Sequence, residues 1–304
     1  MSLRIAIVTD DPGWHGARLR AAFAARGCAV RLVSLRECRL ETGPGAPGVW
    51  LPGFGGRLPD GVFVRGVPGG SLEEVVFYLD ILHGLRELGV PVVNDARAIE
   101  RTVDKGMTSL LLHRAGIATP PAAVVTGAGE ARRRVLEARA RGGELVCKPL
   151  FGSQGEGVVR VTEPDQLPPA AACRGVWYLQ RFVPVAGRCH DWRVFVIGGR
   201  AVAAMRREGE GWVSNVARGG RCEAALLDDT LRSLAEGAVA ALEMDYAGVD
   251  IIRDADGRAW VLEVNSVPAW KGLQSVCSLD IAAALADHCL RRCAGAPAAL
   301  EALP

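Results

Sequence analysis

A glycine-rich stretch between two short apolar segments restricts the local fold more than any other feature of this sequence. Leu145–Pro149 is followed by the loop Phe151-Gly-Ser-Gln-Gly-Glu-Gly157 and then by Val158–Val161. Short apolar runs bounded by glycine and proline predict two strands joined by a loop. Glycines let a backbone approach a phosphate closely and aim several N–H groups at it. A P-loop would open a helix, whereas here a strand follows. We therefore expect the tip of a hairpin that covers a nucleotide; an ordinary glycine-rich hairpin is the alternative.

Lys148 strengthens the nucleotide interpretation. It lies beside Val146, Cys147 and Pro149 in an otherwise apolar strand, three residues before the loop begins. Burying an unpaired ammonium group is costly, so an anionic partner is expected. A phosphate is a natural one, because lysine acts as a compact point charge. The alternative is a side chain that reaches solvent at the edge of the strand.

Three oxygen-bearing side chains lie in two later strand-like segments. Asp250 interrupts the apolar run 247–252, and Glu263 and Asn265 are two residues apart in 259–265. Residues two apart on a strand point to the same face. Magnesium prefers a few protein oxygens together with phosphate oxygens. The pattern therefore predicts a magnesium site if the two strands pair; a polar stripe facing solvent is the alternative.

A third group of candidates is rich in arginine. Asp191-Trp-Arg193 is followed by Ser214-Asn-Val-Ala-Arg-Gly-Gly220, which contains Asn215 and Arg218. Arginine can hold a planar carboxylate or a phosphoryl oxygen with two parallel hydrogen bonds. The adjacent glycines permit close approach to a ligand. By itself this segment is a weak signal.

The order of the remaining segments predicts an α/β fold. Arg4–Thr9, a helix at 16–26 and Ala29–Leu35 form a β-α-β opening, which favours an open parallel sheet. Ser71 and Glu74 form a capping box before a helix at 72–88. Residues 42–60 are expected to be irregular. From residue 100 on, the segments predict α+β lobes, with a helix from Thr102 to Ala115 and a closing helix at 279–293.

Bulk properties exclude several classes of protein. A chain of 304 residues suggests two or three domains, and its net charge of +2 favours neither nucleic acid nor a membrane as partner. No run of apolar residues approaches the length of a membrane span. The arginines at 132–134 look like the solvated face of a helix. Nine scattered cysteines fit reduced thiols in a cytoplasm, and the five histidines form no spacing typical of a metal site.

Taken together in their order, these segments resemble the ATP-grasp superfamily, specifically the RimK-like α-L-glutamate ligases. The resemblance covers roughly residues 60–293. It rests on 94–97 with 102–105, on 147–149 with 152–157, and on 178–183, 191–193, 214–220, 247–250 and 263–265. The amino-terminal segments 10–16 and 63–66 are similar to a subgroup associated with tetrahydromethanopterin-linked one-carbon metabolism in methylotrophs.

The resemblance implies an ATP-grasp fold in three parts: an amino-terminal open parallel-sheet (pre-ATP-grasp) domain at 1–100, a small central α+β lobe at 101–184 and a carboxyl-terminal α+β lobe at 185–304. It implies an ATP-dependent carboxylate–amine ligase that works through an acyl-phosphate, with two Mg²⁺ ions (or Mn²⁺) as cofactors. Its substrates would be a small-molecule carboxylate and an amino acid, glutamate, and relatives of this kind often form homo-oligomers.

The resemblance also implies a role for each matching residue. The nucleotide-binding set would be Lys105, Lys148, Gly152, Ser153, Gln154, Gly155, Gly157, Gln180, Arg181, Phe182, Val183, Asp191 and Ser214. The metal ligands would be Asp250, Glu263 and Asn265. Arg193, Asn215 and Arg218 would face the transferring phosphoryl group and the acyl-phosphate.

Two positions depart from the family pattern. Arg181 stands where an acidic residue usually accepts a hydrogen bond from the adenine amino group, so backbone carbonyls or Gln180 must do so. Ala269 stands where relatives often have glycine, which affects the loop after the metal ligands. The rival functions are a protein-tail glutamate ligase, a kinase-like or carboxylase ATP-grasp enzyme, and a nucleotide-binding regulator without catalytic activity.

The amino-terminal part is expected to help recognise the larger substrate. Trp14 and Arg65 follow short apolar strands, in loops where an open parallel sheet collects its ligands. An aromatic face could stack on a heteroaromatic ring, and an arginine could pair with a carboxylate or phosphate. The alternative is a tryptophan packed under its own loop and an arginine in a surface ion pair.

Overall fold

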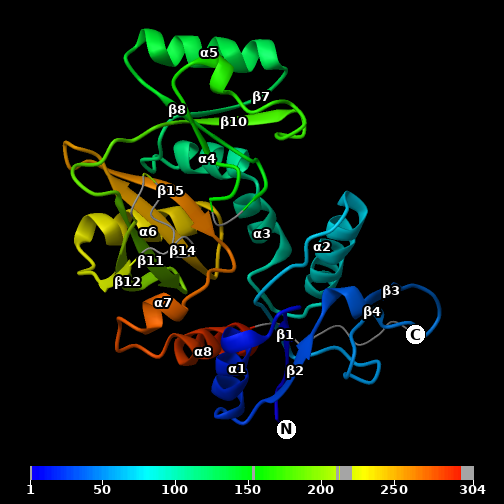
Figure 1. Cartoon of the computed structure of the whole chain (residues 1–304). Helices are drawn as coiled ribbons and strands as arrows, with labels where there is room; N and C mark the ends of the chain where they lie inside the picture. The colour runs from blue at the N-terminus through cyan, green and yellow to red at the C-terminus, as the bar shows by residue number, and fades with distance from the viewer. Residues whose placement is uncertain (1, 153–154, 210–211, 213–220, 296–304) are drawn as a thin grey trace. The chain divides into compact units, whose positions relative to one another are not determined.

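Strand β1 (Arg4–Val8) is almost entirely buried and lies inside a four-stranded parallel sheet in the computed structural model (Figure 1). The structure describes residues 2–152, 155–209, 212 and 221–295. The chain folds into two compact units. Unit 1 comprises Met1–Ile99, Met244–Tyr246 and Val267–Pro304, and unit 2 comprises Glu100–Glu243 and Ala247–Ser266. The division into three parts expected from the sequence, 1–100, 101–184 and 185–304, stays a prediction.

The sheet of unit 1 has the strand order β2-β1-β5-β6, and every pairing is parallel. Its members besides β1 are β2 (Ala29–Val33), β5 (Gly61–Val64) and β6 (Val92–Val93). Helix α1 (Gly13–Ala24) connects β1 to β2, and α2 (Leu72–Glu87) connects β5 to β6. The expected β-α-β opening and open parallel sheet are confirmed, as is the capping box of Ser71 and Glu74 at the start of α2.

Residues 42–60 are more regular than expected. A short 3₁₀ helix (Leu35–Glu37) leads into a two-stranded antiparallel hairpin of β3 (Arg39–Glu41) and β4 (Gly48–Trp50). The prediction of an irregular excursion was wrong for β4, because a three-residue strand is too short to show an alternating pattern.

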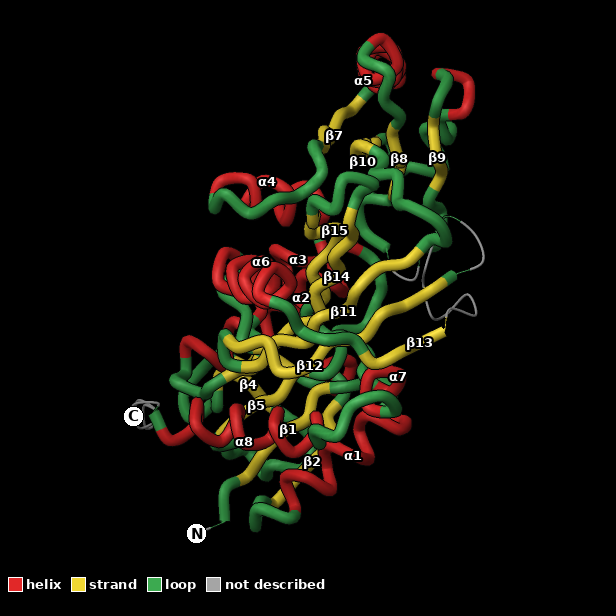
Figure 2. Tube along the Cα trace, turned by 90° about the vertical axis from the view of Figure 1, so that its left-hand side faces the viewer, coloured by secondary structure: helices red, strands yellow, loops and turns green. Residues whose placement is uncertain are grey.

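The closing helix α8 (Ile281–Ala294) belongs to unit 1 and packs against α1, as Figures 1 and 2 both show. Ile281 and Leu285 are fully buried. Arg18 pairs with Asp280 at 2.8 Å at the surface. Because exposed ion pairs contribute little to stability, the buried apolar side chains hold this helix in place. The short α7 (Lys271–Gln274), which the sequence did not reveal, precedes it.

Unit 2 contains two antiparallel sheets. The first has the order β7-β10-β8-β9 and comprises β7 (Ala122–Thr126), β8 (Leu145–Lys148), β9 (Val159–Val161) and β10 (Val176–Arg181). Helix α5 (Ala128–Ala140) covers one face of this sheet (Figure 1), where its Ala131 and Val135 pack on Cys147, Trp177 and Leu179. A 3₁₀ turn (Pro164–Gln166) follows β9. Strands β8 and β9 form the expected hairpin around the glycine loop.

The second sheet has the order β13-β12-β11-β14-β15 (Figure 2). Its strands are β11 (His190–Ile197), β12 (Arg200–Glu208), β13 (Arg221–Ala224), β14 (Tyr246–Arg253) and β15 (Ala259–Asn265). Helix α6 (Asp229–Ala241) packs on it. Asp250 and Glu263 lie on β14 and β15, so the local fold of this sheet decides the geometry of the acidic residues.

The helix expected from Thr102 to Ala115 is instead two helices, α3 (Ala96–Val103) and α4 (Lys105–Arg114). Asp104 is the N-cap of α4, and its carboxylate accepts hydrogen bonds from the N–H groups of Gly106 and Met107 at 2.8 and 3.0 Å. A side chain that satisfies free N–H groups in this way starts a new helix. The break fixes Lys105 in the first turn of α4.

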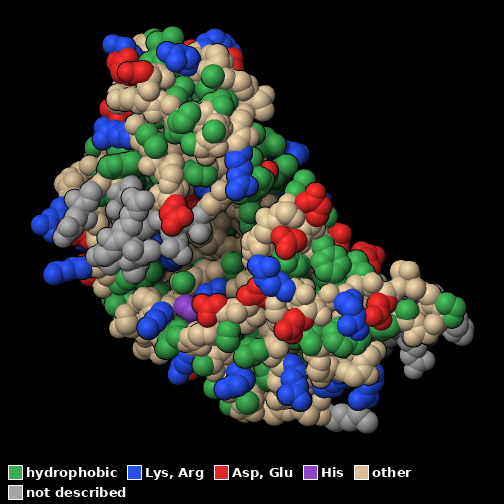
Figure 3. Space-filling model, turned by 45° about the vertical axis from the view of Figure 1, so that its right-hand side comes forward, with side chains coloured by type: hydrophobic (Ala, Val, Ile, Leu, Met, Phe, Trp, Pro, Cys, Tyr) green, Lys and Arg blue, Asp and Glu red, His purple; other side chains and the backbone are tan. Residues whose placement is uncertain are grey.

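The surface of α5 is the solvated helix face that the arginine run suggested. Arg133 pairs with Glu130 and Glu137, and Arg134 with the same two glutamates. Figure 3 shows basic and acidic side chains mixed over this helix, at the top of the view. Among the described helices none is long and apolar enough to cross a membrane. All nine cysteines are free thiols.

Candidate functional site

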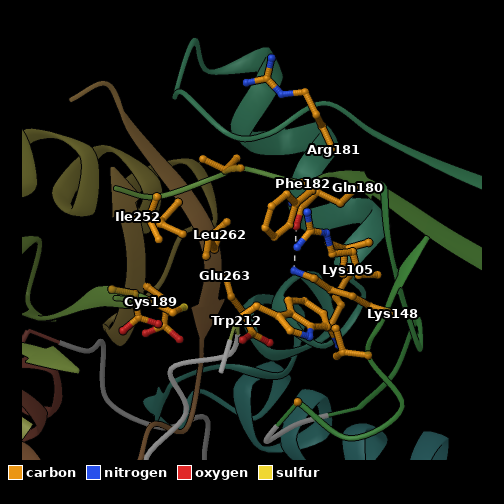
Figure 4. A pocket seen from close by; sticks show the side chains of 18 of the residues that line it. Lys105, Lys148, Gln180, Arg181, Phe182, Cys189, Trp212, Ile252, Leu262 and Glu263 are labelled. Carbon is orange, nitrogen blue, oxygen red and sulfur yellow. Dashed lines mark hydrogen bonds between the residues drawn. The ribbon is translucent and has the colours of Figure 1, made fainter. Parts of the chain in front are cut away.

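A pocket of about 480 Å³ opens within unit 2 (Figure 4). It is lined by residues from both sheets, from the start of α4 and from the segments around the glycine loop. The residues that line the pocket include the polar and charged side chains of Lys105, Lys148, Gln180, Asp191, Asp250 and Glu263. Val146, Phe182, Val183, Ile252 and Leu262 supply an apolar part. Pockets of this kind, mostly apolar with a few convergent polar groups, are typical ligand sites.

Lys148 ends β8 and points into this pocket. Its Nζ donates a hydrogen bond to Gln180 Oε1 at 2.7 Å, across the antiparallel pairing of β8 with β10 (Figure 4). Burial lowers the pKa of Lys148 to about 8, and the nearby Glu263 only partly offsets this. An ammonium group that is costly to charge in this way is stabilised by any anion that enters the pocket.

Lys105 brings a second cation to the same place. Its Nζ donates a hydrogen bond to the carbonyl oxygen of Gly152 at 2.8 Å, which connects α4 to the beginning of the glycine loop. Burial also lowers the pKa of Lys105, while Glu263 and Asp104 act in the opposite direction. Like charges repel, and Lys105 contributes to the lowered pKa of Lys148. Two partly desolvated lysines therefore face one cavity.

The carboxylates come from the pairing of β14 with β15. Asp250 lies opposite Glu263, and Gly248 lies opposite Asn265. The register shifts beside Asp250, so that Ile251 pairs with Val261 and Leu262 is the extra residue of a bulge. Bulges re-aim side chains and are frequent next to active sites. Here Leu262 and Glu263, although consecutive, both line the pocket.

Glu263 is held in an environment that suits a cation. Burial raises the pKa of its carboxyl, and the neighbouring Asp250 raises it further, while Lys105 and Lys148 lower it. A divalent ion would relieve the repulsion between the two carboxylates. Among the described residues no group of three or more His, Cys, Asp or Glu gathers at one point. Two carboxylates with the Asn265 amide would thus leave several positions of a magnesium octahedron to phosphate oxygens and water.

Two arginines, Arg193 and Arg207, pair with Asp250. Arg193 forms two hydrogen bonds of 2.7 Å with the two oxygens of Asp250. Arg207 forms two with Asp191, at 2.6 and 2.7 Å, and lies 3.0 Å from Asp250 Oδ2. Burial opposes ionisation of Asp250, but the two arginines outweigh it and hold its pKa below the usual range.

Arg207 is a site residue that the sequence interpretation missed. It is 2% exposed and lies opposite Asp191 in the pairing of β11 with β12. The signal was present in the alternation of β12, where Ala201, Ala203 and Met205 are buried and Arg207 continues the same face. A charge at an inward position of a strand requires a buried partner of opposite sign.

The aromatic end of the pocket is formed by Phe182 and Trp212. Their ring centroids are 6.2 Å apart in an edge-to-face arrangement, and the guanidinium of Arg160 lies 4.1 Å from the centroid of Phe182. Arg181, in contrast, points away from the pocket (Figure 4) and lies over the ring of Trp260 at 4.7 Å. Arg181 is among the residues that line the pocket, but its guanidinium is directed to Trp260, and Gln180 Oε1 is already bound to Lys148. If an adenine binds here, as the sequence led us to expect, backbone carbonyls would have to accept from its amino group.

Several predicted site residues lie outside the described part of the chain: Ser153, Gln154, Ser214, Asn215 and Arg218. Of the glycine loop, Gly155 and Gly157 have positive φ angles of 73° and 66°. A Cβ at Gly157 would lie 2.9 Å from Pro149 Cγ. Only glycine fits there, both because of its backbone angle and because the chain passes so close to Pro149.

Two family models match the chain. The RimK PreATP-grasp domain matches residues 3–99, and the RimK-like ATP-grasp domain matches residues 102–289. The tetrahydromethanopterin:alpha-L-glutamate ligase of Methanosarcina acetivorans is 30% identical over 303 residues, with 88% of this chain and 92% of that protein covered. The protein of the same description from Methanocaldococcus jannaschii is 36% identical, with coverages of 71% and 75%. Probable alpha-L-glutamate ligase 2 of Hahella chejuensis is 33% identical, with 90% of each covered.

Solved structures give the same fold. The RimK domain protein ATP-grasp from Sphaerobacter thermophilus has a TM-score of 0.69 at 23% identity, with 94% of this chain and 99% of that chain covered. The ATP-grasp ligase PsnB, solved with a minimal precursor, has a TM-score of 0.73 at 21% identity, with coverages of 96% and 100%. At these identities the likeness concerns the fold, and it confirms the fold class expected from the sequence.

Proposed function

Because the chain belongs to the RimK-like ATP-grasp family, we propose that it joins the amine of L-glutamate to a carboxylate of a small acceptor, tetrahydromethanopterin or a related cofactor, at the expense of ATP. The chain is an ATP-grasp ligase. The choice of glutamate and of a pterin acceptor is supported by the activities for which the relatives from Methanosarcina acetivorans and Methanocaldococcus jannaschii are named.

One observation carries the proposal: two partly desolvated lysines, the buried carboxylate of Asp250 and the half-buried carboxylate of Glu263 line the same pocket, next to an apolar part. Lys105 and Lys148 offer positive charge for polyphosphate, and Asp250 and Glu263 offer oxygen ligands for its metal ion. Phe182, Val183, Ile252 and Leu262 offer an apolar lining for a planar base. A site for a neutral ligand would not need charges of both signs at such desolvation cost.

We assign the nucleotide contacts on this basis. The lysines would bind phosphate oxygens, the loop at 152–157 would cover them, and residues 180–183 would hold the adenine. Asp191 would lie near the ribose; its carboxylate is already fixed by Arg207, so it would act as a positioned acceptor.

Asp250, Glu263 and Asn265 would hold Mg²⁺, and we propose two ions, with Mn²⁺ as an alternative. When bound, the ions would neutralise phosphoryl oxygens and keep the γ-phosphoryl group in line with its acceptor. Arg193 donates two hydrogen bonds to Asp250 and so fixes the orientation of this carboxylate. A PsnB structure contains Mg and ADP.

The proposed reaction has two steps. An oxygen of the acceptor carboxylate attacks the γ-phosphorus of ATP, the bond to the β-phosphate oxygen breaks, and ADP and an acyl-phosphate result. The amine nitrogen of glutamate then attacks the acyl carbon, phosphate leaves, and the amine loses a proton. Positive charge from Lys105 and Lys148 would stabilise the anionic groups of both steps. Arg193, expected from the resemblance to face the phosphoryl group, is paired with Asp250 and would act through that residue. Arg218, which the family resemblance adds to this set, lies outside the described residues.

The test is a screen read by mass spectrometry. The protein is incubated with ATP, Mg²⁺ and L-glutamate, and with one acceptor at a time: tetrahydromethanopterin, a furan-type cofactor precursor, or a protein with an acidic tail. We expect the pterin to gain one glutamyl residue, with ADP released only when both substrates are present. A product on the protein tail alone would show a protein ligase, and a stable phosphate ester of the acceptor, accumulating over many turnovers without amine, would show a kinase. A homo-oligomer and a cytoplasmic location stay predictions.

A further inference from the structure

A cluster in unit 1 gathers basic and aromatic side chains at the ends of two adjacent parallel strands. Arg65 directly follows β5, and Trp14 and His15 lie in the first turn of α1, after β1. Strands β1 and β5 pair in parallel, so their carboxyl ends lie at the same edge of the sheet. This edge is where open α/β sheets bind their ligands. Trp270 and Lys271, at the start of α7, complete the cluster.

Arg65 is a buried cation whose guanidinium is incompletely paired. Its Nη1 donates to the carbonyl oxygen of Val267 at 3.1 Å, and its Cζ lies 5.4 Å from the centroid of the Trp270 ring. Its Nε is buried without a hydrogen-bond partner, and no carboxylate of the described chain forms an ion pair with it. Burial lowers the pKa of Arg65. Buried polar atoms of this kind are rare unless a ligand or water completes them.

His15 is held so that it adds a further donor. The backbone N–H of Trp270 donates to His15 Nε2 at 3.1 Å, so Nε2 carries no proton and Nδ1 does. Burial, Arg65 and Lys271 lower the pKa of His15 to about 4, while Asp11 opposes them. The imidazole is therefore neutral at physiological pH.

The charges near this cluster favour an anion. Arg65 and Lys271 are cations close enough to influence His15, and Asp11 is the acidic group that faces them. Trp14 lies against His15 at 5.0 Å and against Trp270 at 6.4 Å between centroids, both edge-to-face. Arg65 Nε lacks a hydrogen-bond partner, and a guanidinium can donate from Nε and one Nη together to the two oxygens of a carboxylate.

We propose that Arg65, with His15 and Lys271 beside it, binds a carboxylate of one of the two non-nucleotide substrates. This proposal rests on the ligase function above, which supplies two carboxylate-bearing substrates. It deepens the role expected of Trp14 and Arg65 from the sequence, because the structure adds the donor on His15 and the unpaired Nε of Arg65.

The test is a set of calorimetric titrations of the full-length protein without ATP, in three arms: L-glutamate, tetrahydromethanopterin and inorganic phosphate. We expect one of the two carboxylate ligands to bind, and Arg65→Gln to weaken it by about tenfold or more, as expected for a lost charged hydrogen bond. Arg65→Lys should give a smaller loss, because it keeps the charge but not the paired donors. Arg20→Gln, at an exposed arginine of α1, removes the same charge and should change nothing.

Kinetics separate this proposal from the ligase function. With an active enzyme, Arg65→Gln should raise the KM of one carboxylate substrate while the KM of ATP stays constant. An inactive wild-type protein would count against the ligase function, yet the titrations would still decide on the carboxylate site. Carboxylate affinities that are unchanged in folded Arg65→Gln protein, or binding of phosphate alone, would overturn the proposal and make Arg65 a packing residue.

Discussion

Replacing Lys148 by arginine should remove a proton uptake that accompanies ATP binding. In the ligand-free protein, burial lowers the pKa of Lys148 to about 8, from an ordinary value of 10.5. Phosphate oxygens beside its ammonium group would favour the charged form and restore at least the ordinary value. Between pH 8 and pH 10.5 the complex with ATP therefore carries more bound protons than the free protein.

The size of the effect follows from this difference. Raising the pKa from about 8 to 10.5 corresponds to about 3 kcal/mol of interaction between the ammonium group and the nucleotide. At pH 8 about half of the lysines are neutral before binding, so about half a proton should be taken up per ATP bound. The sign is fixed: ATP affinity should fall by up to about tenfold per pH unit above pH 8. Well below pH 8 Lys148 is already protonated, so its ionisation should add no pH dependence there.

Calorimetry at pH 8 in two buffers with different ionisation enthalpies measures this uptake. Arginine keeps a positive charge but does not titrate in this range, so Lys148→Arg should bind ATP with about half a proton less uptake than the wild-type protein. Lys105 also has a lowered pKa, but it is present in both proteins and cancels in the comparison. Equal proton uptake by the two proteins would refute the placement of a phosphate beside Lys148.

Three further changes test other parts of the structure. Glu263→Ala should abolish turnover in a protein that remains folded by circular dichroism; near-normal turnover would remove it from the metal site. Arg207→Met should lower the free energy of unfolding by ~3–5 kcal/mol in urea titrations, because it leaves buried carboxylates without their guanidinium. The control variant Arg206→Met, at an arginine in surface ion pairs, should lower it by at most ~1 kcal/mol. Equal losses in the two variants would contradict the buried network. Asn94→Ala should cost ~3 kcal/mol or more, since the Asn94 amide bonds the N–H and the carbonyl of Tyr246 and a further backbone N–H; a loss below ~1 kcal/mol would show that these groups find other partners.

Features carried by local patterns could be predicted from the sequence. The β-α-β opening, the capping box of Ser71 and the hairpin around the glycine loop each depend on residues close together in the chain. The prediction that Asp250 and Glu263 lie close together also assumed that β14 pairs with β15. The two strands do pair, and their register places Asp250 opposite Glu263. Alternation and turn chemistry were sufficient for these features.

Features that depend on distant partners could not be predicted. Arg207 has its partner Asp191 on the neighbouring strand; the alternation along β12 marks Arg207 as an inward position, but it does not identify that partner. The packing of α8 on α1 joins the two ends of the chain, which no periodicity reveals. The bulge at Leu262 shifts the register by one residue without a glycine to mark it. Each of these is decided by tertiary pairing and not by local propensity.

The formation of an acyl-phosphate is the most direct test of the proposed ligase chemistry. The protein is incubated with ATP, Mg²⁺ and the acceptor carboxylate, with hydroxylamine in place of glutamate, and the products are separated by chromatography and identified by mass spectrometry. An acyl-phosphate would be captured as the hydroxamate of the acceptor, with one ADP and one phosphate for each hydroxamate formed, and none should form with Glu263→Ala. Release of AMP and pyrophosphate together with the hydroxamate would show instead that the carboxylate is adenylated, and would contradict the phosphoryl transfer proposed for this pocket.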